Sequence, residues 1–239
     1  MIIDIVTIFP NFFNEFLTTS IVKRAIESNI VKINIHDLRN YSDNKHKQID
    51  DTPYGGGVGM LMTFPPFYRI IKELKTKDTK VIFLTPQGNL YNQETATKFA
   101  LEDKHLILLC GHYEGIDQRV LEFVDYEISI GDYVLTGGEI PAMIVSDAIV
   151  RLLPGVIQEE SHTTDSLSND RLKYPQYTKP ESFEGYDVPS VLVSGHHGNI
   201  DLYRKYMSIK VTEEKRPDLI VKTPLSKEEL KIKEKYMKK

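Results

Sequence analysis

The stretch SIGDYVLTGGEIPAM, residues 129–143, decides the fold class. It overlaps the end of a β-like run at residues 126–130, passes through Gly131 and then Gly137-Gly138, and continues with apolar residues at helical spacing. A strand followed by a glycine-rich loop and a helix is typical of ligand-binding α/β proteins. The glycine spacings of dinucleotide-binding and P-loop motifs are both absent, so the loop predicts a ligand site of another kind.

The same alternation of strand and helix extends over the first 160 residues. Helical spacing at residues 11–29, 65–75, 92–103, 116–124 and 139–153 separates short runs rich in Ile, Val and Leu. These runs, the predicted strands, are residues 2–8, 31–35, 80–85, 105–110 and 126–130. The pattern predicts an α/β fold with a mostly parallel sheet covered on both faces. Loops with glycine follow Leu84, Leu109 and Ile130, and they predict one composite pocket at the carboxyl ends of the strands.

The chain changes character after Pro154-Gly155, which ends the last of these helices. The next stretch, QEESHTTDSLSND, is polar and typical of a linker. We therefore expect an α/β domain at residues 1–160, a flexible linker at 161–172 and a smaller, mainly helical domain at 173–239.

Composition narrows the class of protein. The chain has 239 residues, 41% of them hydrophobic, and no apolar run long enough to cross a membrane. The amino terminus lacks the features of a signal peptide, and a single cysteine fits a reducing compartment, so we expect a cytoplasmic protein. A net charge of -4 argues against a general nucleic-acid coat but allows a local basic patch.

Several polar residues have an ordinary structural interpretation when each is taken alone. Cys110 is typical of a buried small side chain, Arg151 of an ion pair with Asp147 or a helix C-terminus, and Asp165 of a helix N-cap. The glycine-rich segment DDTPYGGGVGMLM, residues 50–62, fits a flexible turn as well as a ligand loop. The adjacent histidines of GHHGN have no further Cys or His nearby, so no metal site is expected.

Together these segments resemble one family, the TrmD-type bacterial tRNA (guanine-N1)-methyltransferases of the SPOUT class. The matching motifs run in family order along nearly the whole chain: IFP, DDTPYGGGVGMLM, LTPQG, CGHYEGIDQRV, SIGDYVLTGGEIPAM, RLLPGV, TTDS, YPQYTKP and VPSVLVSGHHGNI. The resemblance implies a deep trefoil knot, a tRNA substrate, and a homodimer whose active site is shared between the chains.

The implied reaction moves the methyl group of S-adenosylmethionine to N1 of the guanine immediately 3′ of the anticodon. Asp165 is then the general base for the N1 proton, and Arg151 stabilises the charge that develops on O6. The implied cofactor-binding residues are Pro86, Gly111, Tyr113, Glu114, Ile130, Gly131, Asp132, Tyr133, Val134, Leu135, Gly137 and Gly138. RNA contacts are expected from Gly57, His197, Arg204 and Lys205, although the last three equally suit a solvated helix face.

Three positions depart from the family pattern. Thr52 replaces the arginine of DDRPYGGG, Gln176 replaces a histidine, and Lys173 stands where most members have an acid. In some members that acid, with the carboxylate matching Glu114, is linked to magnesium, and Lys173 argues against this arrangement. Three alternatives remain open: Asp170 as a substitute ligand, a metal that acts through the RNA, and a reaction without a metal. A lysine at this position would also favour the phosphate backbone.

Alternatives remain from other functional classes. Another SPOUT methyltransferase, acting on a ribose 2′-hydroxyl or a ribosomal RNA base, would lack TTDS and YPQYTKP. A non-catalytic knotted RNA-binding protein is disfavoured by the presence of both Arg151 and Asp165. A dinucleotide-dependent redox enzyme is excluded by the missing glycine fingerprint.

Overall fold

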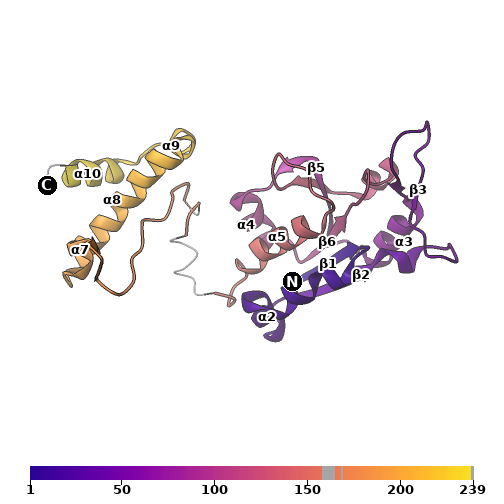
Figure 1. Cartoon of the computed structure of the whole chain (residues 1–239), viewed down its shortest axis with the longest axis horizontal. Coiled ribbons are helices and arrows are strands. Elements are labelled where there is room, and N and C mark those ends of the chain that lie inside the picture. Colours follow the sequence, from indigo (N-terminus) through magenta and orange to yellow (C-terminus); the bar gives the residue numbers. More distant parts are fainter. Residues whose placement is uncertain (158–164, 168, 238–239) are drawn as a thin grey trace. The chain divides into compact units, whose positions relative to one another are not determined.

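The computed structural model describes residues 1–157, 165–167 and 169–237. The chain forms two compact units, Met1–Gln158 and Glu159–Lys239, and each is considered by itself (Figure 1). Among the described helices, none is both long and apolar enough to span a bilayer.

A five-stranded sheet forms the centre of the first unit. Its strands are β1 (Ile2–Thr7), β2 (Lys32–Asp37), β5 (Thr79–Leu90), β6 (His105–Cys110) and β7 (Tyr126–Ser129). They lie in the order β2-β1-β6-β5-β7, and every neighbouring pair is parallel. The predicted α/β fold with a mostly parallel sheet is therefore confirmed.

Helices cover both faces of this sheet, as expected for strands that are apolar on both sides (Figure 1). One face packs against α2 (Ser20–Glu27), α4 (Gln93–Glu102) and α5 (Glu139–Val150). The other face packs against α3 (Phe64–Leu74) and two 3-10 helices, η2 (Leu38–Tyr41) and η3 (Gln118–Phe123).

The local predictions differ from the structure in three places. The helix predicted at residues 11–29 is divided into η1 (Pro10–Phe13), α1 (Asn14–Thr18) and α2, because Thr19 is extended and Ser20 has a positive φ of 55°. The predicted helix at 116–124 is the 3-10 helix η3. Strand β5 continues past the predicted end at residue 85, because it meets β7 a second time.

The second unit is mainly helical, as predicted. A hairpin of β8 (Ser182–Phe183) and β9 (Tyr186–Asp187) precedes α7 (Ser190–Val193), α8 (His197–Lys215), α9 (Pro217–Lys222) and α10 (Lys227–Met237). Among the described residues of this unit, the buried apolar side chains are Tyr203, Ile209, Leu219 and Ile232.

Part of the segment predicted as a linker packs against these helices. The amide of Leu172 donates to the Thr212 hydroxyl at 2.8 Å, and the Ser208 hydroxyl donates to the Leu172 carbonyl at 2.6 Å. Residues 161–164 and 168 of that segment lie outside the described residues. The three-part division of the chain and the trefoil knot stay predictions.

Candidate active site

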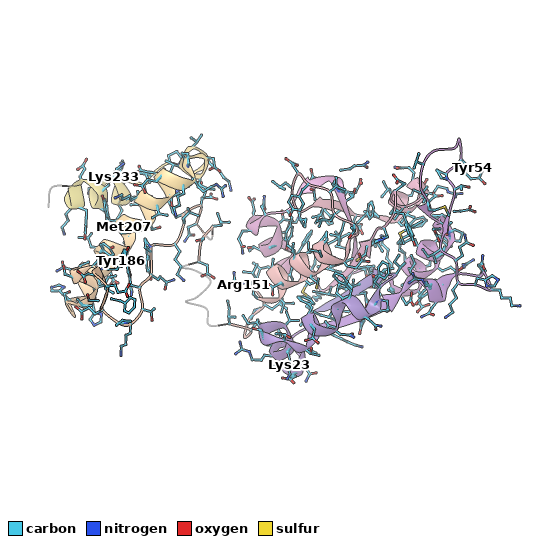
Figure 2. All side chains as sticks on the ribbon, in the orientation of Figure 1. Lys23, Tyr54, Arg151, Tyr186, Met207 and Lys233 are labelled. Atoms are coloured by element: carbon cyan, nitrogen blue, oxygen red, sulfur yellow. The ribbon has the colours of Figure 1, made fainter. Side chains whose placement is uncertain are left out.

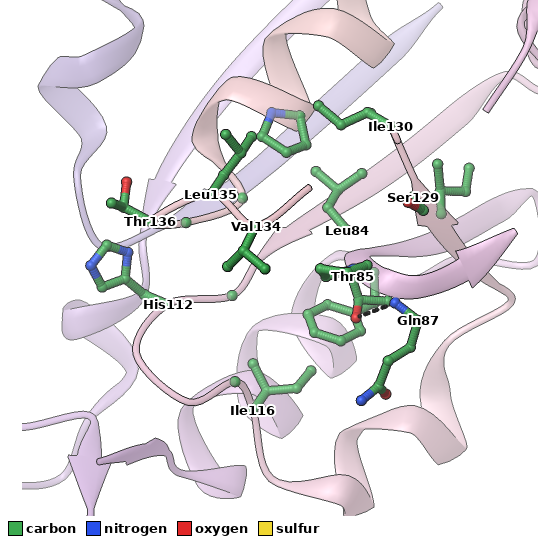
Figure 3. Close-up of a pocket in the computed structure, with 18 of the residues that line it drawn as sticks. Leu84, Thr85, Gln87, His112, Ile116, Ser129, Ile130, Val134, Leu135 and Thr136 are labelled. Carbon is green, nitrogen blue, oxygen red and sulfur yellow. Dashed lines mark hydrogen bonds between the residues drawn. The ribbon is translucent and has the colours of Figure 1, made fainter. Parts of the chain in front are cut away.

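A cavity of about 450 Å³ opens where β5 leaves its pairing with β7, beside the carboxyl ends of β6 and β7 (Figure 3). Since β5 lies between β6 and β7 in the sheet, residues 83–87 of β5 lie beside the segments that follow β6 and β7. Leu84, Ile116 and Val134 come from three different segments and surround one space in Figure 3. The composite pocket expected from the three glycine-containing loops is therefore present in the first unit.

The interruption in β5 opens one side of this cavity. β5 pairs with β7 up to Leu84, leaves the ladder, and pairs again from Asn89 onward. Gly88 makes this return tight, because a Cβ there would lie 2.4 Å from the carbonyl carbon of Glu127 and from the next amide nitrogen. The intervening Thr85 and Gln87 consequently line the cavity, and the Gln87 amide donates to the Thr85 hydroxyl at 3.3 Å (Figure 3).

The loop between β7 and α5 closes the cavity from the other side. Gly138 donates its amide proton to the Gly111 carbonyl at 2.9 Å. A Cβ on Gly138 would lie only 2.6 Å from the Cα of Cys110, so the two segments approach more closely than a side chain permits. The backbone of residues 137–138 is therefore held directly against the end of β6.

A buried hydrogen bond ties this loop to the first strand. The Thr7 hydroxyl donates to Glu139 Oε1 at 2.8 Å, and Glu139 is 5% exposed at the first position of α5. The partial positive charge of a helix amino terminus stabilises a carboxylate there. Neither residue was predicted from the sequence, where the only sign was a polar side chain next to apolar runs.

The close approach of Gly138 to the end of β6 also encloses Cys110, which is buried. Burial, together with the nearby Glu139 carboxylate, raises the pKa of the Cys110 thiol well above its usual range. The thiol stays protonated and packs as a small apolar group, which agrees with its interpretation from the sequence.

The cavity brings together the residues predicted to bind the cofactor. All of them line it except Asp132, which is exposed. Tyr133 lies across Gly131, and its hydroxyl donates to the Ile130 carbonyl at 3.2 Å. The shared lining supports these assignments, and cofactor binding by each residue stays a prediction. Lining residues not predicted individually include Phe83, Leu84, Gln118, Leu121 and Ile128, which lie on strands and in η3.

The glycine-rich loop at residues 52–60 contacts the cavity residue Glu114 through its last two residues. The short strands β3 (Asp50–Asp51) and β4 (Leu61–Met62) bound the loop, and the Glu114 amide donates to the Met60 carbonyl at 3.1 Å. A Cβ on Gly59 would lie 2.6 Å from the Glu114 side chain. Tyr54 is fully exposed at the outer end (Figure 2), and Gly57, a predicted RNA contact, is exposed with a φ of 140°.

The two predicted catalytic residues belong to different units. Arg151 is half-buried directly after α5 (Figure 2), and its amide donates to the Asp147 carbonyl at 3.1 Å. Asp165 belongs to the second unit, where its carboxylate accepts a hydrogen bond from Lys173 Nζ at 3.3 Å. The structure thus brings Asp165 together with Lys173, a residue that the sequence marked only as a departure from the family.

The predicted RNA contacts of the second unit lie along α8, and all are exposed. His197 begins the helix, and the guanidinium of Arg204 lies 5.1 Å from the centre of the Tyr174 ring. Lys205 Nζ is 3.2 Å from a carboxylate oxygen of Glu228.

Within the described ranges, no cluster of His, Cys, Asp and Glu suits a metal ion. Asp170, the substitute magnesium ligand considered from the sequence, is hydrogen-bonded within the second unit. Hydrogen bonds from the Thr223 hydroxyl and from Lys222 hold the pKa of the Asp170 carboxyl below its usual range. Its two carboxylate oxygens are both used within the second unit.

Comparison with known proteins assigns the chain to a family. The model for tRNA (guanine-1)-methyltransferase TrmD matches residues 1–222. This chain belongs to that family. A protein named tRNA (guanine-N(1)-)-methyltransferase from Acholeplasma laidlawii (strain PG-8A) is 61% identical over 238 residues, covering 100% of this chain and 98% of the relative. One of the same name from Clostridium novyi (strain NT) is 53% identical over 240 residues, covering 100% and 99%. The resemblance deduced from the motifs is confirmed.

Membership of a methyltransferase family implies use of S-adenosylmethionine, and the cavity fits such a molecule. Its volume is in the range of small-molecule sites. The backbone of Gly111, Gly137 and Gly138 lines the cavity, while Leu84, Ile116 and other apolar side chains provide surface for the uncharged parts of a ligand.

Proposed function

We propose that this protein methylates N1 of the guanine immediately 3′ of the anticodon in tRNA, using S-adenosylmethionine and producing 1-methylguanosine and S-adenosylhomocysteine. The observation that carries the proposal is the cavity formed by the middle of β5 and the segments that follow β6 and β7, all within the residues that match the TrmD family model. The shared name of the relatives supports the same reaction.

The cavity residues orient the cofactor. The segments at residues 84–87 and 129–138 offer backbone N–H and C=O groups that can read an adenine, because part of β5 has left its ladder with β7. When bound, S-adenosylmethionine supplies an electrophilic methyl group and leaves as a neutral thioether.

Two side chains of this chain act on the guanine. The Asp165 carboxylate accepts the N1 proton as the new N–CH₃ bond forms, and the electrons of the broken S–CH₃ bond stay on sulfur. The Arg151 guanidinium stabilises the negative charge on O6, and loss of such a donor typically lowers the rate about 10²–10³-fold. Both steps require a dry, closed site, since water competes for the same hydrogen bonds.

The proposed assembly is a cytoplasmic homodimer with a knotted core. Residues 1–160 form the methyltransferase domain, 161–172 the linker and 173–239 the tRNA-binding domain. Ile140 and Ile144, one turn apart on α5, are each 41% exposed, which supports a protein partner on this helix face. In the dimer, Asp165 of one chain serves the cofactor cavity of the other.

The test is methyl transfer from labelled S-adenosylmethionine to two tRNA transcripts. One carries guanine immediately 3′ of the anticodon, and the other carries adenine there. We expect incorporation only into the first, recovered as 1-methylguanosine after nucleoside digestion. Methylation of a ribose, of another base, or of both transcripts equally would contradict the proposal.

A further inference from the structure

Lys173 contacts the carboxylate to which the proposed function gives the proton. Its Nζ is 3.3 Å from Asp165 Oδ1, and its backbone amide donates to the Ser166 hydroxyl at 3.0 Å. The side chains of Lys173 and Asp165 are 24% and 23% exposed, so this pair is largely shielded from water within its own unit. Such a pair is stronger than a fully exposed ion pair.

The backbone that carries Lys173 is fixed by three helices. Leu172, its neighbour, is hydrogen-bonded through both its amide and its carbonyl to side chains of α8. The guanidinium of Arg171, 11% exposed, donates to Glu229 of α10 at 2.8 Å and to the Thr223 carbonyl, directly after α9, at 3.0 Å. Lys173 therefore extends from a rigid support toward Asp165.

We propose that Lys173 is the positioning residue for the general base, and that it holds Asp165 at a defined place on the helical unit. The proposal rests on the proposed function, since it assigns a purpose to Lys173 only if Asp165 accepts the guanine proton. A small displacement of a base from its proton lowers the rate strongly, so a fixed carboxylate is an advantage. The ammonium also favours the ionised carboxylate, which is the form that accepts a proton.

The other charged groups of this segment are engaged elsewhere. Among the described residues, Asp170 is paired with Lys222 of α9, and Arg171 is paired with Glu229 of α10. From α8 the segment meets the uncharged hydroxyls of Ser208 and Thr212. These two neighbours therefore have partners on α9 and α10, while Lys173 contacts Asp165.

The experiment compares Lys173→Met and Lys173→Arg with the wild-type protein, using the guanine-containing transcript. Lys173→Met removes the charge, and we expect roughly tenfold lower kcat with less than about twofold change in KM for either substrate. The acid limb of the pH profile of kcat/KM should move upward, because the carboxylate loses the neighbouring positive charge of Lys173. Lys173→Arg should restore most of kcat.

A matched control is Lys233→Met, which removes another half-buried lysine of the same unit, 2.7 Å from Glu213. It should leave kcat and the pH profile within about twofold of wild type. Thermal melting and S-adenosylmethionine binding of each variant separate misfolding from a specific effect. If Lys173→Met unfolds the protein, Lys173→Arg and Lys173→Gln provide the same comparison.

Two results would overturn the proposal. The first is a raised KM for tRNA with unchanged kcat and acid limb, which would make Lys173 a phosphate contact. The second is a Lys173→Met change that lowers the residual rate of an Asp165→Asn protein as much as it lowers the wild-type rate, since a residue acting through Asp165 should have almost no effect there. Failure of the proposed function is separate, because the wild-type protein would then not form 1-methylguanosine.

Discussion

The cofactor cavity and the segment that carries Asp165 are held in place by different forces. The cavity depends on buried strands and on glycines that touch neighbouring backbone, as at Gly88 and Gly138. Asp165 depends on a side-chain ion pair with Lys173 on a helical support. Backbone packing responds little to pH or salt, whereas ion pairs respond to both. Cofactor binding should therefore change little with pH and salt, whereas the proton-transfer step should respond to both.

The largest expected effect comes from removing the base while leaving the cavity intact. Asp165→Asn should lower kcat about 10²–10⁴-fold, because an amide cannot accept the N1 proton. The affinity for S-adenosylmethionine, measured by calorimetry without tRNA, should stay within about twofold of wild type. Near-normal turnover would show that Asp165 is not the base.

A substitution in the loop that lines the cavity should weaken cofactor binding and leave the general base unchanged. Gly138→Ala places a Cβ 2.6 Å from the Cα of Cys110, although the φ of -81° at this position suits alanine. We expect S-adenosylmethionine binding to weaken at least tenfold, with about 1–3 kcal/mol of lost stability from overpacking. Gly198→Ala is the control, because its Cβ would meet only ordinary contacts at 3.6 Å or more. Unchanged cofactor affinity in Gly138→Ala would contradict this account of the loop.

The buried carboxylate of Asp4 makes the stability of the first unit sensitive to acid. Burial raises the pKa of Asp4, but hydrogen bonds from His36, Asn34 and His105 outweigh burial and lower the pKa to about 2 from the usual 3.8. The lowered pKa stabilises the folded state by about 2 kcal/mol above pH 4, and this contribution is lost as the pH falls through about 2.

Urea unfolding between pH 5 and pH 2 tests this effect. The wild-type protein should lose more stability over this interval than an Asp4→Asn variant does, by about 2 kcal/mol. Asp78→Asn, at an exposed position, serves as the control, and its free energy of unfolding should depend on pH as that of the wild-type protein does. If the free energy of unfolding fell equally with pH in the wild-type protein and in Asp4→Asn, Asp4 would not be the source of the acid sensitivity.

The smallest expected effect concerns the hydrogen bond between β1 and α5. Thr7→Val should destabilise the protein by about 1 kcal/mol, since the Glu139 carboxylate loses a donor but keeps the favourable helix amino terminus. Denaturant midpoints measure the loss. Thr7→Ser, which keeps the hydroxyl, should retain most of the stability. A Thr7→Val protein as stable as wild type would mean that this hydrogen bond contributes nothing net.

Much of the candidate site was predictable because its elements are local. The glycines after β6 and β7 stand next to strong strand patterns, and parallel strands present their carboxyl ends at one edge of the sheet. Gly88 was part of a recognised turn, but its contact with Glu127 could not be seen, because it depends on the second meeting of β5 with β7. Lys173 appeared only as an exception until its distance to Asp165 was known.

Hydrophobic periodicity, turn chemistry and motif order are properties of neighbouring residues, so the α/β fold, the glycine-containing loops and the family could be predicted from the sequence. Three features became visible only in the folded chain: the pairing of Thr7 with Glu139, 132 positions apart, the return of β5 to β7, and the support of Lys173 by three helices. Such contacts join residues that fold together from distant parts of the chain, and they leave no periodic pattern in the sequence.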